Sequence, residues 1–255
     1  MKVISLQSGS CGNAIYVESN GTRLLLDAGI TGRQAQLRLG LFGRDIRDVD
    51  AVIISHDHSD HARYLGVYQR KFGLPVCITT RTLDAVARHC QLGQLREIRP
   101  FVSGDTLRFG SVAVHTIRTP HDGADGVAFV IEDGEKRVGV LTDLGYVFDE
   151  LPEVIATLDA VVLESNYDPE MLDAGPYPDF LKRRIRGRGG HLSNRDAAEL
   201  IAESAGTKMK WVCLAHLSEE NNHPQLANRT HADVVGDRFP IHVASRREPT
   251  GVFEV

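Results

Sequence analysis

Short runs of aliphatic and β-branched residues alternate with polar stretches along the whole chain. Runs bounded by Gly, Asn or Asp are typical of β-strands. They occur at residues 1–6, 14–18, 23–27, 51–55, 106–109, 112–117, 127–131 and 137–142. The Asp133-Gly134 pair before the last run predicts a hairpin turn. Two later runs, at 160–164 and 211–215, are continuously apolar and predict strands that are buried on both faces.

Helical periodicity separates these runs. It predicts helices at residues 32–41, 62–72, 82–90, 178–186 and 195–205. Asn194 precedes the last of these segments and is the predicted N-cap. No repeat of fixed period and no low-complexity linker interrupts the chain. The pattern therefore predicts one domain over residues 1–255, with two sheets and helices outside them.

Several predicted strands end on a side chain that can titrate. These residues are Asp27 in LLLDAG, His56 in AVIISH, Asp143 in VGVLTD, Glu164 in AVVLES and His216 in WVCLAH. Ligands of open α/β sheets bind beyond the carboxyl ends of the strands, so these side chains are expected to converge on one crevice. The alternative is that each is a polar residue of a surface loop.

The segment HDHSDH at residues 56–61 is the strongest chemical signal in the sequence. Three histidines and a carboxylate directly after an apolar strand cannot pack into a core unless their polar atoms find partners. Imidazole and carboxylate groups are the ligands that zinc, manganese and iron accept. His56 and His58 alternate along an extended turn and can face one ion. Asp60 and His61, at the start of the next helix, can serve a second ion.

Two ions need more ligands than six residues provide. His121 in TPHDG, Asp143 in LTDLG and His216 in LAHLS each lie in a turn or at a strand end, and each taken alone could be a capping residue. Together with the cluster they supply His56, His58 and His121 for one ion, Asp60, His61 and His216 for the other, and Asp143 as a bridge. The sequence therefore predicts two divalent ions, zinc or manganese, with iron as an alternative.

Composition narrows the function. The 255 residues are 42% hydrophobic and 25% charged, which is typical of a globular protein. The formal net charge of −5 argues against general binding to nucleic acid. Cys11, Cys77, Cys90 and Cys213 form no CxxC pair, no leader-like segment begins the chain, and no apolar run approaches the roughly 18 residues of a membrane span. These features predict a cytoplasmic protein that does not enter the membrane.

The order of the motifs resembles the metallo-β-lactamase superfamily over essentially the whole chain. LLLDAG precedes HDHSDH, and TPHDG, LTDLG and LAHLS follow it. The resemblance implies an α+β fold, an αββα four-layer sandwich of two mixed β-sheets flanked by helices, with two metal ions at one edge. It also implies that Asp27 orients the site and is not itself a ligand.

Four further segments look like the YycJ/WalJ branch of that superfamily. They are SGSCGNAIYVES from Ser8, ESNYD from Glu164, GGHLSN from Gly189 and AHLSEENN from Ala215. This branch consists of small bacterial metallo-hydrolases that are associated with 5′ to 3′ exonuclease activity on DNA. Cys11 departs from the branch, where relatives often carry Ser, so a role for that side chain is in doubt.

Asp60 and His191 are the predicted catalytic residues. A hydroxide that bridges the two ions would attack phosphorus, and Asp60 is required because it holds one of the ions. His191 is the candidate acid for the leaving oxygen, because it lies 25 residues before His216, as a catalytic histidine does in phosphodiesterase relatives. Glu164 is expected to keep His191 protonated. The alternative is that His191 only caps a helix beside Asn194.

Substrate binding is expected from a basic run and a glycine-rich loop. Residues 180–195 contain six cations and no acidic residue, and Arg183, Arg184, Arg186 and Arg188 are the predicted contacts to a nucleic-acid backbone. Ser10 and Asn13 belong to the loop 8–13, whose backbone N–H groups could hold a phosphate. A solvated helix face and a plain hairpin are the respective alternatives.

The sequence thus predicts a dinuclear metal-dependent phosphodiesterase, with 5′ to 3′ exonuclease activity on DNA as the favoured reaction. DNA is the expected substrate, and repair or replication proteins are candidate partners. One alternative is a hydrolase of small or cyclic phosphodiesters or of RNA ends. The other is a non-catalytic, metal-stabilised nucleic-acid-binding module.

Overall fold

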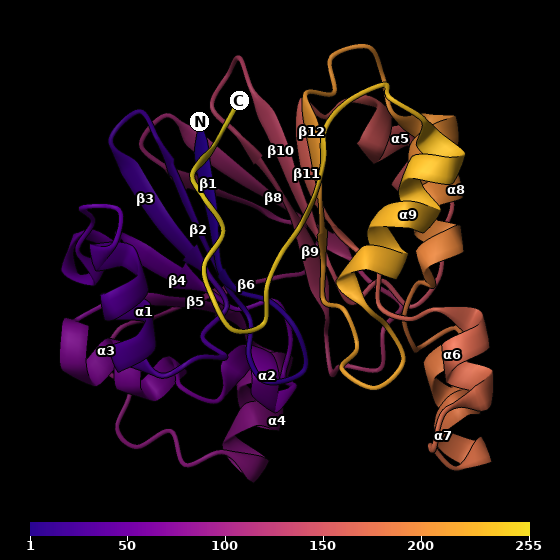
Figure 1. The fold of residues 1–255 in the computed structure, drawn as a ribbon. Helices are drawn as coiled ribbons and strands as arrows, with labels where there is room; N and C mark the ends of the chain where they lie inside the picture. The colour runs from indigo at the N-terminus through magenta and orange to yellow at the C-terminus, as the bar shows by residue number, and fades with distance from the viewer. The chain divides into compact units, whose positions relative to one another are not determined.

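The computed structural model describes residues 1–255 and divides into two compact units. The first comprises residues 1–118, 123–127 and 245–254, and the second comprises residues 119–122, 128–244 and 255. Each unit contains β-strands and helices (Figure 1). That the two units form one domain stays a prediction. No helix combines the length and the apolar character needed to cross a membrane.

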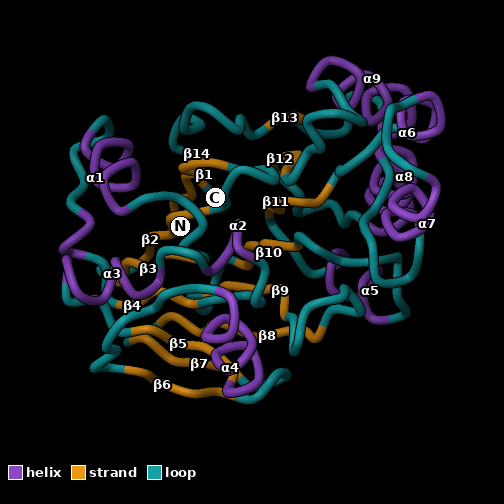
Figure 2. Tube along the Cα trace, turned by 90° about the horizontal axis from the view of Figure 1, so that it is seen from below, coloured by secondary structure: helices purple, strands orange, loops and turns teal.

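The first unit is built on a seven-stranded mixed sheet with the strand order β14-β1-β2-β3-β4-β5-β6. Its strands are β1 (Lys2–Gln7), β2 (Ala14–Ser19), β3 (Thr22–Leu26), β4 (Ala51–Ile53), β5 (Val76–Thr79), β6 (Ile98–Phe101) and β14 (Phe253–Glu254). Strands from β14 to β3 pair antiparallel, and strands from β3 to β6 pair parallel. Figure 2 shows β4, β5 and β6 running side by side. β7 (Thr106–Phe109) and β8 (Val112–Arg118) form an antiparallel hairpin and are the last two strands in the order β13-β12-β11-β10-β9-β8-β7.

Helices cover one face of this sheet. They are α1 (Gly32–Gly40), the 3-10 turn η1 (Ile46–Asp48), α2 (Ser59–Ala62), α3 (Leu65–Phe72) and α4 (Thr80–His89). Apolar residues of β1 to β5, such as Ile4 and Val52, are buried together with Leu39 of α1 and Tyr68 of α3. The packing of these helices on the sheet fixes the positions of the strand ends, and the candidate ligands follow the end of β4.

The helix predicted at 62–72 is interrupted, so α2 and α3 are separate. The carbonyl of Asp60, which would accept from the Tyr64 N–H in a continuous helix, accepts instead from the Asn13 N–H at 2.7 Å. The Tyr64 N–H donates to the Ala28 carbonyl at 3.0 Å. A Cβ on Gly29 would lie 1.6 Å from the Asp60 carbonyl oxygen, so only glycine permits this close approach.

The second unit contains a mixed set of strands in the order β13-β12-β11-β10-β9. They are β9 (Val127–Glu132), β10 (Arg137–Leu141), β11 (Ala160–Glu164), β12 (Trp211–Ala215) and β13 (Ile241–Val243). The pair β9 and β10 is antiparallel, and the other pairs are parallel. Every residue of β11 and β12 is buried, as their continuous apolar runs predict.

Five helices belong to the second unit. They are α5 (Glu150–Ala156), α6 (Pro169–Ala174), α7 (Asp179–Arg186), α8 (Asn194–Ser204) and α9 (Pro224–Val235). α8 contacts both α5 and α9, and Figure 1 shows the three helices together beside β11 and β12. The small pair α6 and α7 has its own apolar contacts through Leu172, Ile185 and Tyr167.

The predicted N-cap of α8 is wrong by one residue. Ser193 is the N-cap, because its Oγ accepts from the Asp196 N–H at 3.1 Å while the Asp196 carboxylate accepts from the Ser193 N–H at 3.3 Å. This reciprocal capping box satisfies two backbone donors at once. Asn194 is the first helical residue, and its buried side chain serves another network described below.

Candidate metal centre

The segment 56–61 gathers four candidate metal ligands in the first unit. It forms the loop after β4 and the start of α2, with His58 as the N-cap. The ring centroid of His56 lies 4.6 Å from that of His58 and 4.2 Å from that of His61. Asp60 Oδ2 lies 3.4 Å from His61 Nε2. Asp57 is not in this group, because its carboxylate accepts from the Ala124 N–H.

Asp27 contacts one of these rings directly and a second through Ser55, and its predicted role in orienting the site stays a prediction. Its Oδ2 lies 2.7 Å from His61 Nδ1, and it accepts from the Ser55 Oγ at 2.9 Å. The same Ser55 Oγ lies 2.9 Å from His56 Nδ1, so it links His56 to the carboxylate. A histidine whose Nδ1–H donates to such a partner presents Nε2 to a metal in a fixed orientation. Sequence reasoning did not identify Ser55, which makes these contacts.

Asn13 belongs to the network around Asp60. Its Nδ2 lies 3.1 Å from Asp60 Oδ2 and 2.9 Å from His61 Nε2, while its Oδ1 accepts from the Gly9 N–H at 2.8 Å. The buried side chain therefore ties the loop 8–13 to two predicted ligands. Ser10, on the same loop, is exposed. Substrate binding by Ser10 and Asn13 stays a prediction.

The second unit gathers a second set of candidate metal ligands around Asp143. Asp143 Oδ1 lies 3.5 Å from His216 Nδ1, 3.7 Å from His121 Nε2 and 3.7 Å from His191 Nδ1. Donor atoms of Asp143, Glu164, His191 and His216 all lie within 4.8 Å of one another. Within each unit, the structure thus brings together the candidate metal ligands, and in the second unit Glu164 and His191 lie with them. Convergence of both sets on one crevice stays a prediction.

Three of the predicted site residues adopt a left-handed backbone within two residues after the end of a strand. The φ angles are +67° at Asp27, +57° at Asp143 and +55° at His216. This conformation is uncommon for residues other than glycine, and it clusters at functional sites. At His216 it is held in place by Asn166, whose Nδ2 donates to the His216 carbonyl at 2.7 Å.

Buried amides brace the same region of the second unit. Ser165 Oγ donates to Asn194 Oδ1 at 2.6 Å, and Asn194 Nδ2 donates to Asn222 Oδ1 at 2.9 Å. Asn222 Nδ2 in turn donates to the carbonyls of Ser165 and Asn166, at 2.9 and 3.0 Å. We call Ser165, Asn166, Asn194 and Asn222 the amide cluster. It joins the end of β11, the start of α8 and the loop that follows His216.

His191 pairs with a fully buried carboxylate. Its Nδ1 lies 2.6 Å from Glu164 Oε1, and Glu164 Oε2 accepts from the N–H groups of Leu144 and Leu192, at 3.0 and 3.2 Å. Burial alone would raise the pKa of Glu164, but the charge and hydrogen bond of His191 hold it below its usual value. Glu164 is therefore ionised beside His191. Since Ser193 caps α8, the alternative that His191 is a cap does not hold.

Some arginines of the basic run at residues 180–195 are already paired within the protein, so only part of the run is available to bind an anion. Arg184 forms a two-point ion pair with Asp122, at 2.6 and 3.0 Å, and Arg186 pairs with Asp173. Arg183 is exposed on α7. The guanidinium carbon of Arg188 lies 4.3 Å from the ring centroid of Tyr146. Binding of a nucleic-acid backbone by these arginines stays a prediction.

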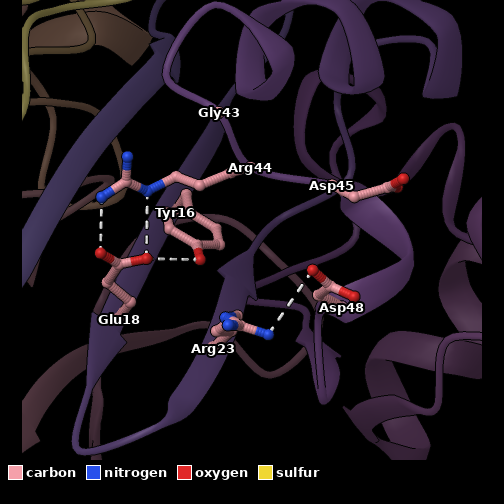
Figure 3. A pocket seen from close by; sticks show the side chains of 7 residues that line it. All are labelled: Tyr16, Glu18, Arg23, Gly43, Arg44, Asp45 and Asp48. Carbon is pink, nitrogen blue, oxygen red and sulfur yellow. Dashed lines mark hydrogen bonds and ion pairs between the residues drawn. The ribbon is translucent and has the colours of Figure 1, made fainter.

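A cavity of about 280 Å³ lies elsewhere in the first unit (Figure 3). It is lined by Tyr16, Glu18, Arg23, Gly43, Arg44, Asp45 and Asp48. Its charged groups pair with one another, since Arg44 Nε donates to Glu18 at 3.0 Å and Arg23 lies 3.6 Å from Asp48. It opens at the ends of β2 and β3 that are remote from Asn13 and Asp27, and it contains no predicted site residue.

Comparisons with known proteins agree with this geometry. Residues 22–216 match the family model described as "Beta-lactamase superfamily domain". The chain is 36% identical to "Exodeoxyribonuclease YycJ" of Bacillus anthracis, over 97% of this chain and 96% of the relative. It is 34% identical to "Exodeoxyribonuclease WalJ" of Streptococcus pneumoniae, over 98% of this chain and 96% of the relative.

Among solved structures, the metallo-β-lactamase fold protein YhfI from Bacillus subtilis matches with a TM-score of 0.75. The two chains are 20% identical, and the match covers 100% of this chain and 99% of YhfI. The predicted fold class, α+β with two mixed sheets flanked by helices, is confirmed.

Proposed function

Because the chain belongs to the beta-lactamase superfamily and, within it, to the family of the exodeoxyribonucleases YycJ and WalJ, we propose that it is a metal-dependent DNA exonuclease acting 5′ to 3′. The observation that carries the proposal is the pair of His191 and the buried Glu164, which lies against Asp143 and His216. This arrangement supports a role for His191 as a proton donor beside side chains of the types that bind metal ions.

The ligand assignment is part of the proposal. His56, His58 and His121 would hold one divalent ion, Asp60, His61 and His216 would hold the other, and Asp143 would bridge them. The buried hydrogen bonds of Asp27 and Ser55 support this assignment, because they fix the orientation of His56 and His61. Nitrogen and oxygen donors suit zinc or manganese, with iron as an alternative. When bound, the ions would supply the Lewis acidity that activates water and polarises a phosphodiester.

His191 would act as the general acid. Glu164 accepts the hydrogen bond from Nδ1, which leaves Nε2–H as the proton donor. Water adds to phosphorus and loses one proton to the solvent, the bond to the leaving oxygen breaks, and that oxygen takes the proton from His191. The hydrogen bond to Glu164 also holds the imidazole ring in one orientation.

A nuclease assay with a screen of divalent metals tests this proposal. The substrates are single- and double-stranded DNA labelled at the 5′ or the 3′ end. We expect nucleotides to be released progressively from the 5′ end, and we expect Asp143→Ala to abolish release because it removes the bridging carboxylate. Arg229→Ala, an exposed change on α9, is the control and should keep full activity.

Other results would redirect the proposal. Unchanged activity in Asp143→Ala would contradict the metal mechanism. Turnover of small or cyclic phosphodiesters or of RNA ends, without turnover of DNA, would favour the alternative hydrolase. Tight DNA binding with no turnover under any metal would favour the binding module.

We also propose that the chain forms one domain and acts in the cytoplasm, with repair or replication proteins as candidate partners. The four cysteines support a reducing compartment, since all are free. Burial raises the pKa of the Cys77 and Cys213 thiols to about 11 and about 12, which makes both poor nucleophiles.

A further inference from the structure

Arg188 and Tyr146 form a stacked pair in the second unit that the proposed chemistry does not use. The guanidinium carbon of Arg188 lies 4.3 Å from the centroid of the Tyr146 ring, and its Nη2 donates to the Tyr146 hydroxyl. Phe148 packs edge-on against the tyrosine, with 6.4 Å between ring centroids. Tyr146 is half-buried, whereas Arg188 is exposed. The Arg188 guanidinium therefore lies over the Tyr146 ring and stays accessible to solvent.

The pair lies close to the Asp143 set. Tyr146 follows Asp143 by three residues, and Arg188 precedes His191 by three residues. Three residues of extended chain span at most about 11 Å. The two loops also touch directly, because a Cβ on Gly145 would lie 2.3 Å from the Arg188 carbonyl oxygen. Arg188 therefore lies within about 11 Å of His191, which is a short distance along a bound strand.

The loop that carries Arg188 is held by the same side chains that form the site. The Gly190 carbonyl accepts from His121 Nδ1 at 2.7 Å, and the Gly189 carbonyl accepts from the Asp122 N–H at 3.1 Å. Asp122 is itself fixed by Arg184. The backbone at Arg188 is thus fixed by hydrogen bonds, so less conformational entropy is lost when a ligand binds to it.

We propose that the Arg188–Tyr146 pair is a stacking platform for one nucleobase of the bound strand. This inference rests on the proposed function. A planar guanidinium that is already stacked on an aromatic ring offers a flat, cationic face, and nucleobases stack on such faces whatever their identity. The platform would hold an unpaired base near the cleaved phosphodiester without selecting a sequence. It gives the enzyme a preference for strands whose terminal bases are present and unstacked.

The test compares kcat/KM for two 5′-phosphorylated single strands of equal length, an oligothymidylate and its abasic counterpart. Loss of one stacked base corresponds to roughly a tenfold or larger loss in affinity. We expect the wild type to prefer the oligothymidylate by about that factor. Arg188→Lys, which keeps the charge but loses the plane, should reduce the preference to near unity. Tyr146→Phe keeps the ring and should keep the preference.

Arg238→Lys is the matched control, because Arg238 also lies over an aromatic ring, that of Phe239, at 5.6 Å. It should keep the wild-type preference. Equal cleavage of both strands by the wild type, or an undiminished preference in Arg188→Lys, would overturn the platform while leaving the nuclease intact. Hydrolysis of bis-p-nitrophenyl phosphate without cleavage of either strand would overturn the proposed function and the platform with it.

Discussion

Single polar residues, most of them buried, decide how the candidate ligands are presented. Asp27 and Glu164 each accept several hydrogen bonds and leave a histidine in one orientation. The motifs predict the ligands and both carboxylates, because their residue types and positions at strand ends are visible in the sequence. Ser55, Asn166 and Asn222 could not be predicted, because nothing in their local sequence shows which backbone or ring they will meet.

Removing the Ser55 hydroxyl should weaken metal binding. In Ser55→Ala, His56 Nδ1 loses its partner at 2.9 Å, and Asp27 loses a donor. Loss of such an outer hydrogen bond typically costs about 10- to 100-fold in metal affinity. Competition titration with a zinc chelator measures the change. Ser10→Ala, an exposed serine, is the control, and equal affinity in both variants would contradict the role of Ser55.

Removing the His191 imidazole should slow cleavage without releasing metal. General acid catalysis contributes about 10²- to 10⁴-fold, so His191→Ala should lose activity within that range. Metal content, measured by atomic spectroscopy after gel filtration, should equal that of the wild type. His223→Ala, an exposed histidine at the start of α9, serves as the control. Loss of metal together with activity would reassign His191 as a ligand.

At the scale of elements, hydrophobic runs predict most strands but miss the short buried strand β5 and the short edge strands β6, β13 and β14. The buried runs of β11 and β12 are recognised easily, whereas β13 and β14 lie at the edges of their sheets and are short and half-exposed. The edge strand β6 contains Pro100, which is tolerated because an edge strand can spare one N–H. Helices α6 and α9 begin at a proline and lack a long apolar stripe, so periodicity alone does not reveal them.

Helix α9 contains a histidine that should make stability depend on pH. His231 is fully buried, and burial lowers its pKa from 6.5 to about 4. The contribution of His231 to the free energy of unfolding is complete above pH 6.5 and is lost as the pH falls toward 4. The reason is that the unfolded chain then binds a proton that the folded chain excludes. Between pH 7 and pH 5 this amounts to roughly 2 kcal/mol in the free energy of unfolding.

Urea denaturation of His231→Leu at pH 7 and pH 5 measures this contribution. The free energy of unfolding should change less between pH 7 and pH 5 than it does in the wild type, by roughly 2 kcal/mol. His223→Leu, an exposed change on the N-cap of the same helix, should leave the difference unaltered. An unchanged pH dependence in His231→Leu would show that another group is responsible.

For the whole molecule, a net charge of −5 opposes an approach to DNA, so local cations must overcome it. Arg183 is exposed on α7, and the ion pairs of Arg184 and Arg186 leave it as the cation of that helix best placed to contact a phosphate. Arg183→Ala should weaken DNA binding equally for all sequences and reduce the slope of log K against log salt by about one. Arg229→Ala should leave that slope unchanged, and an unchanged slope in Arg183→Ala would place the contact elsewhere.

The pairing of β1 with β14 has a consequence for how the protein is made. Val3 lies opposite Phe253, and the Ser5 N–H donates to Thr250 Oγ1 at 3.0 Å. On the ribosome β1 emerges long before β14 is synthesised, and β14 can reach it only after Phe253 and Glu254 have left the ribosome. Until then one edge of β1 is unpaired. An unpaired strand edge can pair with another chain, so the first unit is exposed to aggregation during that interval.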